Sequence, residues 1–463
     1  MGVGVSNWCL AQTVSRIGQL GVVSGTGLDQ ILARRLQEGD PGGHIRRALS
    51  HFPFPGMAKR IQDALFVPGG KKPKVPYLSL GAHVLKGRRV IEELCIVANY
   101  VEVYLAREGH SNPVGINYLE KIQLPHLPSI YGAMLAGVAV VIVGAGIPVE
   151  MPRVLDVLAN HQVATYPIHV TGAQPDTDHH AVFDPAVFRE ETLSLPPLRR
   201  PDFLPIISSD ALATMLIRRA NGSIEGFVIE GPRAGGHNAP PRGQLHLTPD
   251  GQPIYGPRDV VDLAAMRKLG LPFWLAGSYG SPERLRSALA EGAAGIQVGT
   301  AFALCVESGL NGDLRRALVQ KALTGSAPVF TDPLASPTGF PFKIAQLKGT
   351  LSDAEVYRHR HRVCDLGFLR EAYLQADGSI GYRCPAEPES SYVAKGGKAA
   401  DTVGRVCICN GLFSNTGFAQ CLPDGSREPY LVTLGDDFAD IGRFCTREHP
   451  DYMAADVVRI LLG

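Results

Sequence analysis

The sequence predicts an α/β protein built on a parallel sheet, and two observations lead to this fold class. Over most of the first 345 residues, short β-branched runs alternate with longer amphipathic segments, which is the pattern of βα units. The chain has 463 residues, more than a single barrel of eight βα units usually needs. We therefore expect a parallel α/β core together with insertions or a second domain.

The composition excludes several functional classes. Lys and Arg total 45 against 44 Asp and Glu, so no basic excess attracts nucleic acid or an anionic membrane. The longest apolar run, residues 134–149, is shorter than the roughly 20 residues that cross a bilayer. The first residues show no leader pattern, and the nine cysteines, an odd number, argue against a disulfide framework. We expect a cytoplasmic protein that binds neither nucleic acid nor membrane.

The predicted elements follow one another from the N-terminus. A helix capped by Ser6 ends at Gly18, and a strand follows at 21–24. Residues 29–109 form no clean βα unit and are read as a helical insertion, and residues 161–202 as a surface excursion. The other strands are predicted at 113–118, 138–144, 203–208, 226–229, 273–276 and 295–298.

This list gives seven strands where a closed barrel has eight. The missing strand should come first in the chain, with residues 2–5 as the loop at its carboxyl end. We therefore expect either that the strand precedes Met1 or that this chain lacks it.

Two glycine-containing loops close the last two predicted strands, at residues 276–280 and 297–300. Glycines there let backbone N–H groups approach an anion, and the helix that starts at Ser281 and Pro282 adds free donors. In a barrel, the loops after strands seven and eight form the usual phosphate site. The alternative is that the glycines only make tight turns, but their joint placement favours phosphate.

A third loop, residues 230–238, follows the strand at 226–229 and carries the candidate catalytic residue. Gly235 and Gly236 permit backbone to lie flat against a planar ring, and His237 can transfer a proton near neutral pH. Isolated histidines are more often structural. The position of His237 at the carboxyl end of a barrel strand favours a catalytic role.

These motifs resemble those of the nitronate monooxygenase (2-nitropropane dioxygenase-like) family. The similar segments are Met1–Ser6, Pro113–Asn117, the Gly235–His237 turn, Ala276–Ser278 and Gln297–Thr300, spread over residues 1 to 345. The resemblance implies an FMN-binding (β/α)8 TIM barrel whose first strand is truncated here. It also implies a small acidic-carbon substrate such as an alkyl nitronate, with O2 as electron acceptor.

The resemblance also assigns residues. It implies Gly2 and Gly4 near the isoalloxazine, Asn117 on the ring or the phosphate arm, and Gly235 with Gly236 beside the flavin. Gly277, Ser278, Gly299 and Thr300 would hold the phosphate, with Gln297 in the same segment, and His237 would take a proton from the carbon next to the nitro group. Glu230 departs from the glutamine common in the family, and its charge would alter the electronics of the flavin.

Two other functions fit the same motifs. The barrel and its histidine turn also resemble flavin-dependent enoyl-acyl carrier protein reductases, so an NAD(P)H-dependent enoyl or quinone reductase is one alternative. The other is a non-catalytic barrel whose cysteine-rich tail is a metal-dependent interaction module.

The C-terminal region, residues 346–463, is predicted to be a small cysteine-rich module closing over the barrel mouth. It holds six of the nine cysteines, and Cys364, Cys384, Cys407 and Cys409 are the candidate ligands of zinc or an iron–sulfur cluster. The usual Cys-x-x-Cys pairs are absent. Buried, reduced core cysteines are therefore the alternative.

Overall fold

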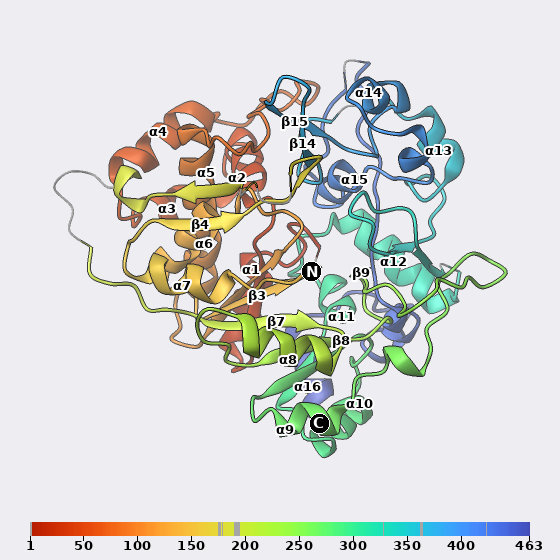
Figure 1. The fold of residues 1–463 in the computed structure, drawn as a ribbon. Helices are drawn as coiled ribbons and strands as arrows, with labels where there is room; N and C mark the ends of the chain where they lie inside the picture. The colour runs from red at the N-terminus through yellow and green to blue at the C-terminus, as the bar shows by residue number, and fades with distance from the viewer. Residues whose placement is uncertain are drawn as a thin grey trace.

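The computed structural model describes residues 2–174, 177, 179–188, 195–326, 328–361, 364–422 and 424–463. Its centre is a curled sheet of seven parallel strands in the order β1-β2-β3-β7-β8-β10-β11 (Figure 1). The strands are β1 (Gly21–Ser24), β2 (Val114–Leu119), β3 (Val140–Gly144), β7 (Asp202–Ile207), β8 (Phe227–Glu230), β10 (Phe273–Ala276) and β11 (Gly295–Gln297). All seven predicted strands are confirmed within one or two residues. Among the described residues, β1 and β11 are the two edges of this sheet.

Alternating residues of the strands face the two sides of the sheet. Val140, Ile142 and Leu204 share one cluster, to which Val228 and Ala276 also belong, and this cluster lies on the concave side. The neighbouring residues in each strand face outward, into two apolar clusters beneath the helices. One cluster contains Val141, Val143 and Phe203. The other contains Phe227, Ile229, Phe273 and Leu275. Both faces of the strands are therefore buried, which explains why the strands read as continuous apolar runs.

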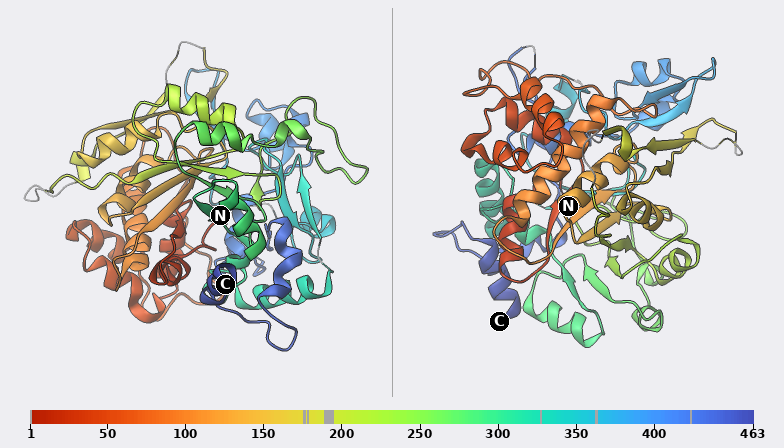
Figure 2. Two further views of the ribbon diagram at one scale, coloured as in Figure 1. Left: turned by 90° about the horizontal axis from the view of Figure 1, so that it is seen from below. Right: turned by 90° about the vertical axis from the view of Figure 1, so that its left-hand side faces the viewer.

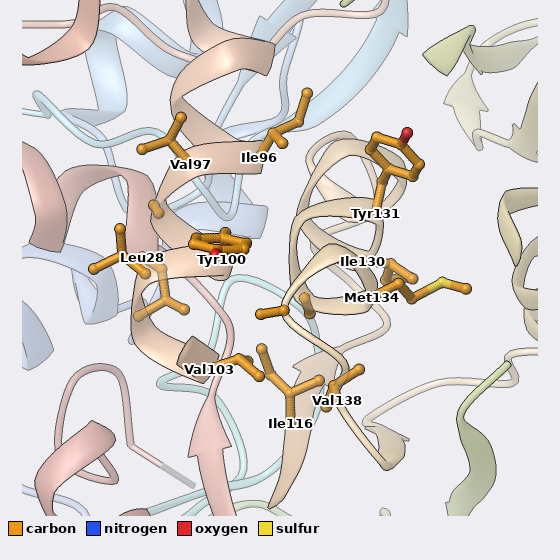
Figure 3. Packing of buried hydrophobic residues seen from close by; sticks show 14 of the residues in the cluster. Leu28, Ile96, Val97, Tyr100, Val103, Ile116, Ile130, Tyr131, Met134 and Val138 are labelled. Carbon is orange, nitrogen blue, oxygen red and sulfur yellow. The ribbon is translucent and has the colours of Figure 1, made fainter. Parts of the chain in front are cut away.

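Helices cover the outer face. The largest helix pair is α5 (Arg89–Arg107) with α6 (His126–Leu135), which Figure 3 shows side by side, and Gly132 of α6 lies directly against the backbone of Ile96 in α5. The segment predicted as a helical insertion is helical, with α2 (Leu28–Gln37), α3 (His44–Leu49) and α4 (Pro55–Leu65) before α5. Because α5 contacts both β1 and β2, it serves as the crossover helix between these strands.

The first helix, α1 (Trp8–Arg16), corrects one prediction. Its cap is Asn7, whose side chain accepts a hydrogen bond from the Leu10 backbone N–H, and not Ser6. The Ser6 hydroxyl instead donates to the Val22 carbonyl at 2.6 Å, so it ties the N-terminal segment to β1. The helix ends before Gly18, which has a φ of 84°.

The remaining helices follow the later strands and the tail. They are α7 (Met151–Ala159), α8 (Asp210–Arg219), α9 (Leu263–Lys268), α10 (Pro282–Ala290), α11 (Thr300–Ala303), α12 (Gly312–Thr324), α13 (Ala354–His359), α14 (Glu389–Ala394), α15 (Ile408–Ser414) and α16 (Ala454–Leu462). Helix α16 packs against α1 and α10, so the end of the chain lies beside its beginning (Figure 2). Within the described ranges, no helix is long and apolar enough to cross a membrane.

Three small sheets lie beside the central sheet, and one of them joins it to the tail. Antiparallel β12 (Val329–Asp332), β13 (Phe342–Ala345) and β9 (Gly236–His237) form one sheet. β5 (Val170–Thr171) joins β14 (Glu371–Leu374) and β15 (Ile380–Arg383), and β4 (Ala164–Pro167) pairs with β6 (His180–Phe183). Residues on both sides of position 345 share two apolar clusters. The domain boundary at residues 345 and 346 therefore stays a prediction, and the tail shares its packing with the barrel.

Candidate active site

A cavity of about 630 Å³ lies on the concave side of the sheet and opens at the carboxyl ends of the strands. This volume is typical of a site for a cofactor and a small substrate. Its lining includes the predicted residues Gly2, Asn117, Glu230, Gly235, Gly236, His237, Gly277, Ser278, Gln297, Gly299 and Thr300. The fold thus gathers residues from all parts of the first 300 positions into one cavity.

Gly4 does not line this cavity, and Met1 of the same motif lies outside the described residues. The backbone of Gly4 has a φ of 64°, and a Cβ there would lie 3.0 Å from Thr416 Cγ2 and 3.1 Å from Ile31 Cδ1. Packing against these two side chains explains the glycine without a ligand. In this structure Gly4 thus contacts Thr416 and Ile31, and the place beside a flavin ring that the resemblance implies for it stays a prediction.

His237 is held from two sides. Its strand β9 pairs with β13, where Phe342 is the partner in register and its ring centroid lies 4.8 Å away at a steep angle. The ring Nε2 is hydrogen-bonded to Ser336 Oγ at 2.7 Å, and Ser336 is fully buried. Burial lowers the pKa of His237 to about 3 because desolvation penalises the imidazolium. The ring is therefore neutral at physiological pH.

Glu230 ends β8 opposite Ala276, at the mouth of the cavity. Burial raises the pKa of this carboxyl to about 7, because the charged form loses its solvation. Near neutral pH the side chain thus exchanges between a neutral acid and an anion. Its charge depends on pH in the range where most enzymes work.

The two predicted phosphate loops offer unused backbone donors. Ser278 adopts a φ of 63°, a conformation that side chains rarely adopt, directly after Gly277 with a φ of 93°. In the described structure, the backbone N–H groups of Gly277, Ser278, Gly299 and Thr300 donate to no backbone or side-chain acceptor. Such donors at the mouth of a cavity form an anion site. Ser281 caps the adjacent helix α10 by accepting from the Arg284 N–H at 3.2 Å.

The tail adds a group that the sequence analysis missed. Gly435 N–H donates to Thr300 Oγ1 at 2.9 Å, and Thr300 also hydrogen-bonds Asp437. Burial raises the pKa of Asp437, and the bond to Thr300 partly offsets this. A Cβ on Gly235 would lie 2.8 Å from the Gly435 nitrogen, so the tail also accounts for that glycine. No sequence pattern signals these contacts, which join residues more than 130 positions apart.

Asn117 and Gln297 close other sides of the cavity. Asn117 is buried near the end of β2, and its Nδ2 donates to the Ile142 carbonyl at 3.4 Å. Gln297 ends β11 in register with Ala276 of β10. Both amides therefore stand at the carboxyl edge of the sheet, where a ligand can reach them.

The four predicted metal ligands all lie in the tail, but in the described part of the chain no three of their sulfurs lie within 4.8 Å of one another. Cys384 follows β15, Cys407 and Cys409 lie at the start of α15, and Cys364 lies between α13 and β14. Burial raises the pKa of the Cys384 thiol to about 12, and Cys407 and Cys364 add smaller contributions. Burial raises the pKa of the Cys409 thiol, and the other three thiols raise it further. Cys409 also lines the cavity.

A separate polar group was not anticipated from the sequence. The Asp29 carboxylate, His83 Nε2 and Cys95 Sγ lie within 4.8 Å of one another, and Asp29 and Cys95 are buried. His83 Nε2 lies 3.0 Å from Asp29 Oδ2. These residues are spread over 67 positions, so only the fold brings them together.

One segment of the chain, which carries His237 and the two glycine loops, is similar in sequence to known proteins. Residues 199–329 match the family model of nitronate monooxygenase. A nitronate monooxygenase from Pseudomonas aeruginosa is 34% identical over 120 residues, which cover 25% of this chain and 32% of the relative. The match thus spans about a third of that relative's length.

The chain also aligns with solved structures at low identity. FabK from Thermotoga maritima aligns with a TM-score of 0.47 and 13% identity over 99% of this chain and 88% of its own. A nitroalkane oxidase from Streptomyces ansochromogenes aligns with a TM-score of 0.46 and 14% identity, covering 100% and 92% of the two chains. The sequence match is therefore the informative one. Residues 199–329, which carry β8, the His237 turn and both glycine loops, are thus the part of the chain that is similar to nitronate monooxygenases.

Proposed function

We propose that this protein is an FMN-dependent oxidoreductase that oxidises a small alkyl nitronate, with O2 as the final electron acceptor. One observation carries the proposal: four free backbone donors and a neutral histidine share a single cavity. The donors suit the phosphate of FMN, and the histidine suits a reacting carbon acid or its anion.

The residues of the cavity fit a flavin. A Cβ on Gly236 or on Gly299 would meet no atom within 4 Å, so their backbones present open surface to the cavity. Gly277, Ser278, Gly299 and Thr300 would hold the phosphate, and Gly236 and Asn117 would border the ring. Bound FMN would supply the capacity to take two electrons from the substrate and to pass them to O2.

Asp437 limits how this phosphate can bind. Its carboxylate bonds the Thr300 hydroxyl and would lie 3.2 Å from a Cβ on Gly280. A phosphate at the same loops would be repelled by the charged carboxylate. Burial raises the pKa of Asp437, so protonation of this carboxyl, which would relieve the repulsion, costs less than for an exposed aspartate.

The chemistry of His237 bears on the form of the substrate. With a pKa of about 3, the neutral ring can accept a proton but is a weak base for a neutral nitroalkane. A nitronate has already lost that proton. Its anion next to the ring would also favour the imidazolium, so His237 would orient and stabilise the anion. Ser336 would keep the ring in place through Nε2.

Anaerobic mixing of the FMN-loaded protein with propyl nitronate tests the proposal. We expect bleaching of the oxidised flavin, with nitropropane reacting at least ten times more slowly because His237 is a weak base. Unchanged flavin absorbance with the nitronate would refute the nitronate function. Reduction by NADH or NADPH alone would instead support the enoyl or quinone reductase.

Two further expectations remain proposals. The four tail cysteines would hold a metal cofactor, zinc or an iron–sulfur cluster, and their common place in the tail supports this. We also place the reaction in the cytoplasm, supported by nine cysteines that are all free thiols in the structure.

A further inference from the structure

Asp29, His83 and Cys95 form a polar group that the proposed flavin site does not use. They come from three segments of the chain: Asp29 lies in the first turn of α2, His83 in the loop between α4 and α5, and Cys95 in α5. The Asp29 carboxylate, a ring nitrogen of His83 and Cys95 Sγ all lie within 4.8 Å of one another. The fold therefore places three different kinds of metal-ligating atom at one point.

The three side chains are largely shielded from solvent. The side chain of Asp29 is 4% exposed and that of His83 12%, and Cys95 is buried. Among the described residues, His83 is the one hydrogen-bond partner of the Asp29 carboxylate, with Nε2 and Oδ2 3.0 Å apart. One hydrogen bond leaves most of the acceptor capacity of a carboxylate unused. A buried charge of this kind is normally paired or coordinates a metal.

The distances fit the ligands of one zinc ion. Tetrahedral zinc holds nitrogen and oxygen ligands at about 2.0–2.2 Å and a thiolate at about 2.3 Å, so its ligand atoms are about 3.3–3.6 Å apart. The His83–Asp29 separation of 3.0 Å is close to this range, but a hydrogen bond has the same length. Cys95 Sγ distinguishes the two cases, because a hydrogen-bonded pair needs no third ligand atom within 4.8 Å. The sulfur can reach the zinc distance through a movement of about 1 Å or less.

A small cavity of about 20 Å³ beside His83 offers the fourth ligand position. This volume is enough for one water molecule. Glu92 also lines the cavity and precedes Cys95 by three residues on α5, so both side chains lie on the same side of the helix. Three protein ligands and one oxygen from this cavity complete a tetrahedral zinc shell.

We propose that Asp29, His83 and Cys95 bind a zinc ion, with an oxygen ligand from the small cavity in the fourth position. The carboxylate and the thiolate carry two negative charges, which the divalent ion neutralises inside the protein. Cys95 loses its thiol proton to solvent when the zinc–sulfur bond forms, and no electron is transferred. Zinc is favoured over calcium and magnesium because those ions prefer oxygen ligands to thiolate and imidazole.

The ion would hold the loop between α4 and α5 against two helices. The backbone of this loop is also bound by the tail, where Arg370 Nη2 donates to the His83 carbonyl at 2.8 Å. The His83 ring lies 5.9 Å from the ring of Phe368, and Phe368 lines the large cavity. Zinc at this point would therefore stabilise one wall of the large cavity from behind.

Zinc analysis of full-length variants after dialysis into metal-free buffer tests the proposal. The wild type should hold one more zinc per chain than His83→Ala, and one more than Cys95→Ala. Cys305→Ala is the matched control, because Cys305 is equally buried and donates its S–H to the Phe302 carbonyl, and it should retain all the zinc. In competition with a chelator, His83→Ala should bind this ion more than about 100-fold more weakly, since loss of an outer-shell partner alone costs about 10–100-fold.

Differences between the samples identify the site even if the tail cysteines also bind metal. Equal zinc in the wild type and His83→Ala would overturn the proposal, and so would an equal loss of zinc from Cys95→Ala and Cys305→Ala. If Cys95→Ala fails to fold, His83→Ala, which changes a partly exposed side chain, decides the question. Chelation should also lower the melting temperature of the wild type more than that of His83→Ala, and an equal decrease in both would contradict the site.

Discussion

Gly277 offers a test of whether backbone geometry or ligand space explains the glycines of the cavity. Its φ of 93° costs an alanine about 1–2 kcal/mol. The added Cβ would also lie 3.1 Å from the Gly231 oxygen and 3.2 Å from the Ala234 nitrogen, and moving that loop costs about 1–3 kcal/mol. Gly277→Ala should therefore lower the free energy of unfolding by about 2–5 kcal/mol.

Two control variants separate the causes. Gly270 has a φ of 73° and no atom within 4 Å of a Cβ, so Gly270→Ala reports on backbone strain alone, about 1 kcal/mol. Gly299 has a φ of −115° and an open Cβ position in the cavity. Gly299→Ala should leave stability within about 0.5 kcal/mol of wild type but weaken FMN binding on the order of ten-fold.

Urea unfolding of the FMN-free variants and titration with FMN give both quantities. Equal stability losses in Gly277→Ala and Gly270→Ala would show that contact with the 231–234 loop is irrelevant. Unchanged FMN affinity in Gly299→Ala would show that the phosphate does not bind at this loop. Either result would refute the corresponding part of the reasoning.

Three further substitutions test buried polar groups. Burial raises the pKa of Glu120 to about 7, so its protonated form stabilises the fold below pH about 4.3, and this contribution is lost as the pH rises to about 7. Glu120→Gln should therefore gain up to roughly 3 kcal/mol over wild type at pH 8 but little at pH 4, measured by urea unfolding. Asp437→Asn removes a carboxylate beside the proposed phosphate loops and should bind FMN about ten-fold more tightly. FMN titrations at increasing pH should show that binding weakens in the wild type, as Asp437 loses its proton, but not in Asp437→Asn. Ser336→Ala removes the partner of His237 Nε2 and should lower kcat for propyl nitronate about ten-fold with KM nearly unchanged, whereas an unaltered kcat would argue against a positioning role.

The strands could be predicted because their signal is local. Val140–Gly144 and Phe203–Ile207 are apolar on both faces, and a parallel sheet covered on both sides requires this. The loops at 230–238, 276–280 and 297–300 could be placed on one edge, since carboxyl ends of parallel strands meet there. These arguments need only neighbouring residues and the direction of the strands.

The tail could not be placed in this way. Asp437 and Cys409 reach the cavity, and Ser336 reaches His237, from loops and short helices whose positions depend on packing against distant residues. Gly4 has the local pattern of a ligand-binding glycine, yet Thr416 and Ile31 decide its role. Contacts over such separations depend on how whole elements pack, and no short pattern encodes them.

The sequence by itself determined the seven parallel strands, the shared edge of the glycine loops and the position of His237 on that edge. Only the tertiary structure decided that His237 is neutral and bound to Ser336, that Asp437 lies at the phosphate loops, and that Gly4 packs against Thr416 and Ile31. The physical reason is the distance along the chain over which each effect acts. Periodicity and turn chemistry act within one element, whereas burial and ionisation depend on every element packed around the group.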